Sequence, residues 1–411
     1  MSNTNLTVDW IGNEALRLAH EKASFLGTIN REFDDSFKAG YGSTIRIRIP
    51  SQYTQTSGRV IDVQDGVEQS TAITVATQNH IALRYNSQEM AQDLVNFQKL
   101  HLEPAMAQLV SYIDGQCLQQ ATQATYNSVG TPGNTVSTLL VPGQARGRLN
   151  QYLAPKNSRR LQLDSMSMAD LVNTQAIYNN PATDISEQFR EGLVTRTAMA
   201  DYYENERVYA QTFGTGTSSW VSSQAITNGT ATLLISTGTW FTPAVGSVFT
   251  LGFTSSVVGG FRACHPETKQ PYSHLQQFTV TAASAATSTI SISPTIYISG
   301  PRKNVVRSDG AEFDGTSNNV STSMLRFQAG GSSTFAQPLM YYKDAFTFAT
   351  AALPMMTDGQ RCVVKTYDGI SLRVWEASDI RNDEKLTRID ILWGFAAIRP
   401  QWACRLIGAA L

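Results

Sequence analysis

Between Phe213 and Pro301 the sequence almost stops carrying charge, and this interval constrains the fold more than any other feature. Only Arg262, Glu267 and Lys269 interrupt a run of Thr, Ser, Gly, Ala and β-branched residues. The sequence on either side has helical spacing and an ordinary content of charged residues. A composition that changes sharply and then reverts indicates an inserted β-domain, so the two flanking pieces must fold together around it.

Period-two alternation within this interval predicts short strands separated by Gly, Pro, Ser and Asn. The expected strands are Ala231–Ser236, Ser247–Phe253, Gln277–Ala282 and Thr289–Ser293. Several short strands at this spacing are typical of a small barrel or sandwich. We place the boundaries of the inserted domain at residues 213 and 319.

Size and charge narrow the class of protein. A chain of 411 residues exceeds what one hydrophobic core supports, so two or more folded units are expected. Charged residues make up 16% of the chain, against about 25% in a typical domain. Low charge suits a protein that covers much of its surface with copies of itself, although a β-rich secreted protein would look the same. The net charge of −1 provides no basic field to grip nucleic acid, so DNA would be enclosed without tight binding.

The cysteines and the ends of the chain favour a reducing compartment. Cys117, Cys264, Cys362 and Cys404 lie far apart and form no CxxC pair, so a zinc or redox motif is not expected. The first ten residues are polar and do not resemble a secretory signal. No stretch approaches the roughly 20 apolar residues that a membrane span requires.

The N-terminal part predicts helices followed by a long hairpin. Apolar residues from Ile11 to Phe37 recur at helical spacing. Between Gly42 and Pro50, isoleucine alternates with arginine, which predicts a strand with one buried face. Residues 51–86 are interpreted as a hairpin that has strands at 59–63 and 73–85 and a turn at Asp65-Gly66. A two-stranded ribbon is marginal by itself in water, so this one is expected to lie on a neighbouring subunit.

Other segments predict one long helix and several shorter elements. Phe97–Asn127 is expected to form a helix about 45 Å long, with an inner stripe formed by Leu102, Met106, Leu109, Ile113, Cys117 and either Gln120 or Ala121. Later expectations are a loop over 128–141, a helix over 168–179, a turn and strand over 190–209, a strand pair over 362–375 with its turn at Asp368-Gly369, an apolar strand over 388–398, and an apolar tail over 403–411.

Catalytic and metal-binding motifs are not found in this sequence. It contains no GxSxG, HExxH or GxxxxGK[ST] pattern. Gly214-Thr215-Gly216 begins a GxGxxG pattern but has Ser219 at the third glycine, and we interpret it as a hinge. Cys264-His265 with His274 matches no standard ligand spacing. We therefore predict a protein that is not an enzyme and that binds no cofactor or metal.

The order of these parts resembles the major coat proteins of tailed double-stranded DNA bacteriophages, in particular the short-tailed-phage branch whose coat protein carries an inserted β-domain. The stretches that carry the resemblance are Gly42–Pro50, Gln188–Gly192, Leu339–Phe346 and Arg388–Pro400. One departure is Ala198-Met199-Ala200-Asp201, where members of the family often show an Ala-Gly-Phe-like turn.

The resemblance implies an α+β chain with the Hong Kong 97-type capsid fold, which has an extended loop and a spine helix in addition to the inserted all-β domain. The implied domains are an N-terminal arm at 1–41, the extended loop hairpin at 42–86, peripheral and axial domains at 87–212, the insertion at 213–319 and the second part of the axial and peripheral domains at 320–411. The implied function is a structural subunit of hexamers and pentamers in an icosahedral shell that encloses double-stranded DNA. Scaffolding and portal proteins are the other expected partners, no membrane is expected, and assembly is expected in the bacterial cytoplasm.

Charged residues around the extended loop are our candidates for subunit contacts. They are Arg46, Arg48, Arg59, Asp62, Asp65 and Glu68. Two other classes of protein stay open from the sequence. A β-rich adhesin or tail-associated binding protein would explain the insertion but neither the long helix nor the Gly42–Pro50 strand. An enzyme of unfamiliar type would need a constellation that the sequence does not show.

Overall fold

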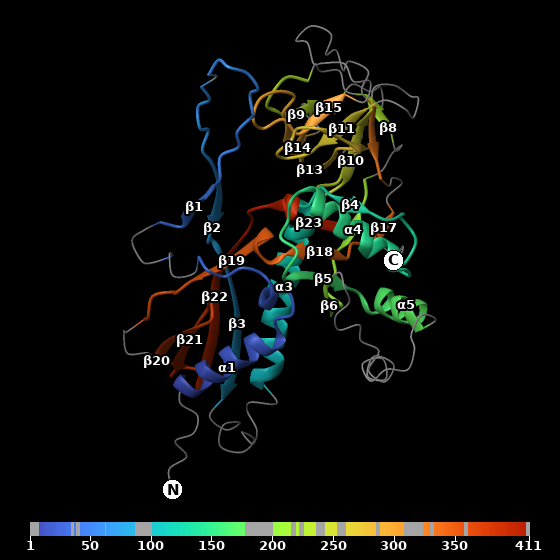
Figure 1. Cartoon of the computed structure of the whole chain (residues 1–411). Coiled ribbons are helices and arrows are strands. Elements are labelled where there is room, and N and C mark those ends of the chain that lie inside the picture. Colours follow the sequence, from blue (N-terminus) through green and yellow to red (C-terminus); the bar gives the residue numbers. More distant parts are fainter. Residues whose placement is uncertain are drawn as a thin grey trace. The chain divides into compact units, whose positions relative to one another are not determined.

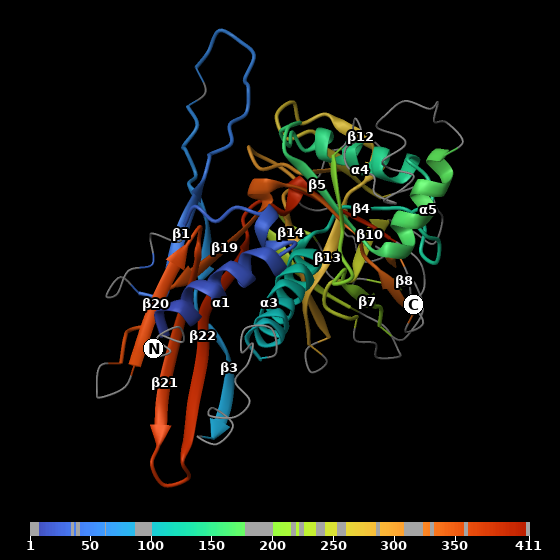
Figure 2. The same cartoon turned by 90° about the horizontal axis from the view of Figure 1, so that it is seen from below.

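The computed structural model describes residues 8–33, 37, 42–61, 63–86, 101–176, 200–214, 219–221, 226–235, 243–252, 260–284, 288–307, 324–328, 333–356 and 361–407. The described chain is α+β (Figures 1 and 2). Its contacts divide it into two compact units. Unit 1 comprises Met1–Arg48, Ser70–Leu118 and Phe346–Ile398, and unit 2 comprises Ile49–Gln69, Gln119–Ala345 and Arg399–Leu411.

Unit 1 is built on an antiparallel sheet in which β22 has the most partners. Strand β22 pairs with β3, β21 and β19, and β20 pairs with β21. A separate ribbon joins β1 and β2. The elements are α1 (Val8–Lys22), η1 (Leu26–Thr28), β1 (Thr44–Ile49), β2 (Gln69–Thr74), β3 (Thr77–Asn86), α3 (Glu103–Ala124), β19 (Phe346–Ala351), β20 (Arg361–Tyr367), β21 (Ile370–Asp379) and β22 (Glu384–Ala397).

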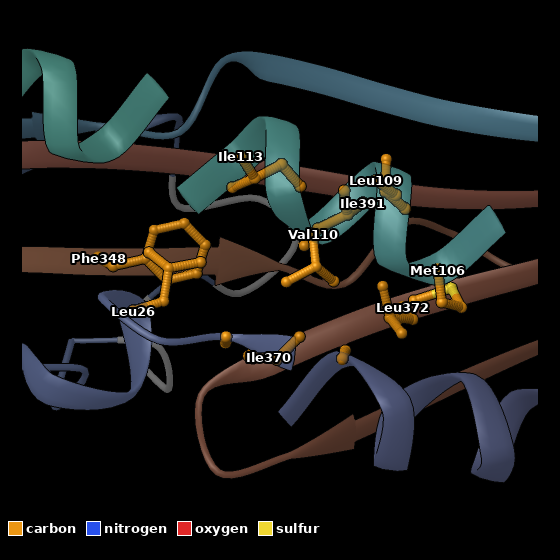
Figure 3. A pocket seen from close by; sticks show the side chains of 11 residues that line it. Leu26, Met106, Leu109, Val110, Ile113, Phe348, Ile370, Leu372 and Ile391 are labelled. Carbon is orange, nitrogen blue, oxygen red and sulfur yellow. The ribbon is translucent and has the colours of Figure 1, made fainter. Parts of the chain in front are cut away.

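The core of unit 1 lies between helices α1 and α3 and the sheet. Met106, Leu109, Val110 and Ile113 on α3 point toward the sheet residues Phe348, Leu372 and Ile391 (Figure 3). The space left among these side chains is about 10 Å³, which is room for one water at most. The first five residues of the predicted inner stripe are buried, so the predicted helical face is confirmed. Of the two alternatives for its last position, Ala121 is buried and Gln120 is exposed.

A buried carboxylate fastens the N-terminal segment to α3. Asp114 is fully buried, and its Oδ1 accepts the backbone N–H groups of Phe25 (3.0 Å) and Leu26 (2.9 Å). Its Oδ2 accepts the hydroxyl of Ser24 at 3.0 Å. These bonds satisfy donors that the η1 turn cannot satisfy itself, because the first N–H groups of a helix have no partner within it.

Unit 2 contains a five-stranded sheet in the order β4-β23-β18-β5-β6 and a short pair, β7 and β17. Helix α4 packs against β23 and β18, and α5 contributes Met168 and Leu171 to the same core. The elements are β4 (Ser128–Val129), α4 (Leu140–Gln151), β5 (Arg159–Leu163), α5 (Ser165–Ala176), β6 (Asp201–Glu204), β7 (Ala210–Thr212), β17 (Thr334–Ala336), β18 (Leu339–Tyr342), η4 (Lys343–Ala345), η5 (Pro400–Trp402) and β23 (Ala403–Leu406).

Strands of the charge-poor interval, with two strands that follow it (β15 and β16), form two further sheets in unit 2, in the orders β8-β16-β10-β13-β14-β9 and β12-β11-β15. Each of the four strands predicted there is present, as β9, β10, β13 and β14. Among the described residues, these nine strands pair only with one another. Their bounds are β8 (Ser219–Val221), β9 (Thr230–Leu234), β10 (Val248–Gly252), β11 (Phe261–Cys264), β12 (Pro271–Leu275), β13 (Gln277–Ser284), β14 (Thr289–Ile296), β15 (Val305–Arg307) and β16 (Met324–Phe327). The insertion boundaries at 213 and 319 stay a prediction, and β16 lies beyond the second.

A buried arginine connects these sheets to the five-stranded sheet. Arg405 of β23 is fully buried and donates to the carbonyl oxygens of Thr125 and Gly246, each at 2.6 Å. It also donates to the carbonyl of Gln123 (3.3 Å) and to the hydroxyl of Thr279 (3.0 Å). One guanidinium therefore joins β23, the chain around the end of α3, the turn that precedes β10, and strand β13.

The structure corrects several predictions around the hairpin. Residues 59–61 and 63 form no strand, since β1 ends at Ile49 and β2 begins at Gln69. The predicted strand at 73–85 is two strands with a break at Val75-Ala76, because β2 pairs with β1 whereas β3 pairs with β22. The Asp368-Gly369 turn is confirmed, and both residues have positive φ, 45° and 78°.

Other differences have local causes. Leu140–Gln151 is a helix although part of it was predicted as loop, because its Pro142, Gly143 and Gly147 hide the apolar pattern. The expected helix at 97–127 is described from Glu103 to Ala124, and residues 97–100 lie outside the described part. The predicted apolar tail contains β23, which pairs with β18 and β4. No helix among the described residues is both long and apolar enough to cross a membrane.

We predict that acid destabilises unit 2 through His274 on β12. Its ring stacks on Tyr272 (centroids 5.3 Å apart), and its Nε2 is buried without a hydrogen-bond partner in the described chain. Burial, with a smaller contribution from Arg148, lowers the pKa of His274 from 6.5 to about 4. Between these two values the unfolded chain binds the proton and the folded chain does not, so stability falls as the pH falls from about 6.5 to 4.

Melting curves of the wild type and of His274→Gln between pH 7.5 and 4 check this prediction. The glutamine variant should lose less stability on acidification. Its melting temperature should therefore rise relative to that of the wild type as the pH falls below 6.5. An identical acid dependence in both proteins would show that His274 does not titrate with unfolding.

Candidate subunit-contact surface

The ribbon of β1 and β2 has two unlike faces. Along β1 the burial alternates, so that Ile45 and Ile47 are half-buried whereas Arg46 and Arg48 are exposed. The isoleucines pack against a small cluster around Ile73, Val75 and Ala349. The exposed face of β1 therefore carries two arginines that are two residues apart along the strand. The sequence predicted this alternation of a buried and a charged face.

The chain between β1 and β2 is a long loop at residues 50–68 (Figure 1). It is closed by side-chain bonds across the loop and not by a strand ladder. Gln64 donates its amide to the carbonyl of Thr54 (2.6 Å), and its Oε1 accepts the Thr54 backbone N–H at 2.9 Å. Nearer the ribbon, the Ser51 hydroxyl donates to the Val67 carbonyl at 3.2 Å. These contacts fix the base of the loop and leave residues 55–63 as its tip.

The tip exposes apolar side chains. Val60 and Ile61 are each 87% exposed and Val63 is 83% exposed. Three β-branched residues almost fully in water within four positions have no packing role in the subunit, and such patches mark sites of protein contact. Sequence reasoning missed them because it treated 59–63 as a strand, although the Val-Ile-Asp-Val run was the visible signal.

The six charged candidates do not form one cluster. Arg46 and Arg48 lie on β1, whereas Arg59, Asp65 and Glu68 lie in the 50–68 loop, and all five are exposed. Asp62 lies outside the described residues. Their role in subunit contacts stays a prediction. No group of three or more His, Cys, Asp or Glu residues in the described part of the chain is arranged to hold a metal ion.

Comparisons with known proteins found one matching family model and several solved structures with a similar fold. A family model described as "P22 coat protein - gene protein 5" matches residues 221–408, slightly less than half of the chain. A solved structure from Mycobacterium phage Che8 matches with a TM-score of 0.51 at 8% identity, over 93% of this chain and 90% of that one. The chain therefore shares the fold of that phage structure. Its fold is the Hong Kong 97-type capsid fold.

Further solved structures are similar to this chain at lower scores. The capsid structure of the cyanophage P-SCSP1u matches with a TM-score of 0.44 at 10% identity, over 90% of this chain and 85% of that one. The capsid of Ralstonia phage GP4 matches with a TM-score of 0.43 at 8% identity, over 95% and 91%. A search of the curated proteins found no match.

The 50–68 loop lies within the predicted extended loop (42–86), and we call it the extended loop below; this assignment and that of α3 as the spine helix stay predictions. The extended loop thus combines an exposed apolar tip, a base closed by Thr54 and Gln64, and a charged ribbon face.

Proposed function

We propose that this chain is a major capsid protein of tailed phages that assembles through its extended loop into pentamers and hexamers, and that these rings tile an icosahedral shell around double-stranded DNA. The observation that carries the proposal is the exposed tip of Val60, Ile61 and Val63. Ring interfaces are heterologous, since one face of a subunit meets a different face of the next. The tip of each loop is then covered by the adjacent copy.

Apolar area supplies most of the energy of such a contact. Exposed ion pairs contribute about 0–1 kcal/mol each, so Arg46, Arg48 and Arg59 mainly set register and partner choice. Burying apolar side chains contributes about 25 cal/mol per Å² removed from water. Weak individual contacts, summed over many copies, also allow misplaced subunits to leave and rebind.

Negative-stain electron microscopy of the purified protein tests this function. Regular hollow particles are expected from the wild type. A variant with Val60, Ile61 and Val63 all changed to Ser should stay as free subunits or small oligomers. Ile380→Ser is the matched control, because Ile380 is also fully exposed (99%) but lies outside the loop. Shells formed normally by the triple variant would contradict the role of the loop.

We predict that the shell is held without covalent links between subunits. Some relatives implied by the resemblance cross-link through a lysine on the extended loop, and this sequence has no lysine between Lys38 and Lys99. Particles boiled in SDS should therefore run as one band at 44.9 kDa. A ladder of higher bands would contradict the prediction.

The strands β8–β16 are proposed to brace the subunit, with Arg405 as one of their connections to β23. Scaffolding and portal proteins are proposed as further partners, and the bacterial cytoplasm as the place of assembly. The role proposed here is structural and involves no catalysis. No specific observation favours the adhesin alternative.

A further inference from the structure

A groove in unit 2 is lined by part of the extended loop and by two turns of the sheets that β8–β16 form. Its volume is about 910 Å³, and every residue that lines it belongs to unit 2. Residues 50–55 of the loop line it, together with Ile49 and Gln69 of the ribbon. The turns are those between β11 and β12 and between β14 and β15. Pockets for small ligands have about 300–1,000 Å³, so this groove has room for a ligand as large as a short peptide.

Four cations line the groove, and none of them forms a salt bridge among the described residues. They are Lys269, Arg302, Lys303 and Arg399, and each is half-buried. The lining has a single carboxylate, that of the exposed Glu267. Charges that are partly removed from water are unfavourable unless an opposite charge compensates them, so the groove favours an anionic occupant.

Burial already acts on two of these cations. It lowers the pKa of Lys269, and it lowers the pKa of Arg399 although the carboxylate of Asp344 acts in the opposite direction. A lowered pKa of a cation shows that its charged form is less well solvated than in water. Carboxylates that bind here therefore meet cations that the subunit has already desolvated in part, and the attraction between such charges is stronger than in open water.

The turn between β14 and β15 is held in place by hydrogen bonds. Asn304 fixes its start, since Oδ1 accepts the Tyr297 backbone N–H at 2.9 Å. Arg302 donates to the Tyr297 hydroxyl at 2.9 Å, and with the amide oxygen of Gln69 turned toward it, Nε donates to that oxygen at 2.7 Å. Arg302 therefore joins the turn to the ribbon. Lys303, whose side chain makes no hydrogen bond within the described chain, is presented from this rigid turn, so little order has to be gained on binding.

The aromatic part of the lining is fixed in a similar way. The Trp402 indole donates to the Tyr152 carbonyl at 3.1 Å, and Tyr152 packs edge-on against Tyr126, with ring centroids 6.0 Å apart. The Arg399 guanidinium lies 4.2 Å from the centroid of the Trp402 ring. A guanidinium stacked on a ring keeps N–H donors directed outward in its own plane, where they suit a carboxylate. Tryptophan, tyrosine and arginine are also the side chains that most often dominate the energy of protein interfaces.

An acidic peptide fits these features better than nucleic acid does. Duplex DNA, the nucleic acid of the proposed shell, keeps its bases stacked inside the helix and leaves none to stack on the rings. The net charge of −1 also provides no basic field for a polyanion. A peptide supplies carboxylates for the cations and apolar side chains for the rings. The chain has no run of more than two acidic residues, so the matching segment is expected in a different protein.

We propose that this groove docks an acidic segment of a partner protein, whose carboxylates bind Lys269, Lys303 and Arg399. An apolar side chain of the same segment packs against Tyr152 and Trp402. The inference rests on the proposed shell function, and it names the chemistry of a partner that binds the subunit. The contact differs from the one between copies, because the exposed apolar side chains of the loop tip do not line the groove. Variants of the groove should therefore lose the partner and still form shells.

A labelled peptide with the sequence Glu-Glu-Trp-Glu-Glu is the probe, and fluorescence anisotropy measures its binding to unassembled subunits and to shells. The wild type should bind it, with an affinity that falls as the salt concentration rises. Lys303→Glu and Lys269→Glu should each weaken binding about tenfold or more, because each places a like charge in the groove. Arg381→Glu is the matched control, since it makes the same change of charge in the exposed hairpin between β21 and β22, and it should bind the peptide as the wild type does. Unchanged melting of the unassembled subunits shows that each variant folds.

The docking proposal is overturned if the wild type does not bind the peptide, if Gln-Gln-Trp-Gln-Gln binds equally well, or if Arg381→Glu causes an equal loss. Tighter binding of a single-stranded oligonucleotide, lost in the same two groove variants, would make the groove a nucleic-acid site instead. Groove variants that fold but form no shells would make it a contact between copies. Failure of the wild type to form shells contradicts the proposed function, and it is distinguishable because peptide binding is measured separately on unassembled subunits.

Discussion

Replacing Arg405 with methionine is expected to cost about 3–5 kcal/mol in the free energy of unfolding of unit 2. The guanidinium is fully buried, and its partners are three backbone carbonyls and one hydroxyl. Burial lowers the pKa of Arg405 to about 9, so the side chain is still protonated at neutral pH. Methionine fills a similar volume but leaves the carbonyls of Thr125 and Gly246 buried without a donor, and each unmet group costs about 1–3 kcal/mol.

Thermal and denaturant unfolding of the unassembled subunit measure this loss. Arg405→Lys should fall between the wild type and Arg405→Met, because one ammonium cannot reach all four oxygens in the plane that a guanidinium offers. Arg381→Met is the matched control, since Arg381 is exposed in the hairpin between β21 and β22. Equal stability of Arg405→Met and the wild type would show that the carbonyls find other partners.

Replacing Asp390 with leucine is expected to be comparably severe in unit 1. Asp390 and Arg373 are buried on neighbouring strands, and Oδ2 accepts from Nη2 at 2.7 Å and from Nε at 3.1 Å. Arg388 also contacts Oδ1, at 2.6 Å, but it is more exposed and can turn to water. Leucine would leave the Arg373 charge buried without its carboxylate, and breaking such a pair costs about 3–5 kcal/mol.

The double variant Arg373→Met/Asp390→Leu separates the charge effect from packing. Because neither charge is then buried alone, it should recover most of the stability lost by Asp390→Leu. Urea unfolding of the four proteins completes a double-mutant cycle, and a large coupling energy between the two positions is expected. If the losses of unfolding free energy in the two single variants simply add in the double variant, the ion pair between Arg373 and Asp390 is not coupled and the prediction is wrong.

Local patterns predicted those elements whose burial follows a simple period. The α3 stripe from Leu102 to Ala121 was readable because one helical face is uniformly apolar. Strands β9, β10, β13 and β14 were readable because they alternate between turn residues. Strands β11, β12 and β15 were missed, since Cys264, His274 and neighbouring polar residues break the alternation and only pairing between distant segments makes them strands.

The candidate site was predictable in part. The alternating arginines of β1 and the long loop followed from the sequence, but the loop was expected to contain a strand at 59–63. Alternation alone does not make a strand, because a ladder needs a partner at the right distance. Here Thr54 and Gln64 close the loop by side-chain bonds, and the tip beyond them is left open.

By itself, the sequence determined the α+β class, the long helix, the charge-poor β segment and the order of parts that resembles a capsid protein. These follow from periodicity and composition, which act between residues close in the chain. Only the tertiary structure decided that an arginine in an apolar tail would be the buried link among three segments. It also decided which cations would share a groove with aromatic rings. Such groups come together across 100 residues or more, and no local pattern encodes which distant backbone oxygen a buried donor will find.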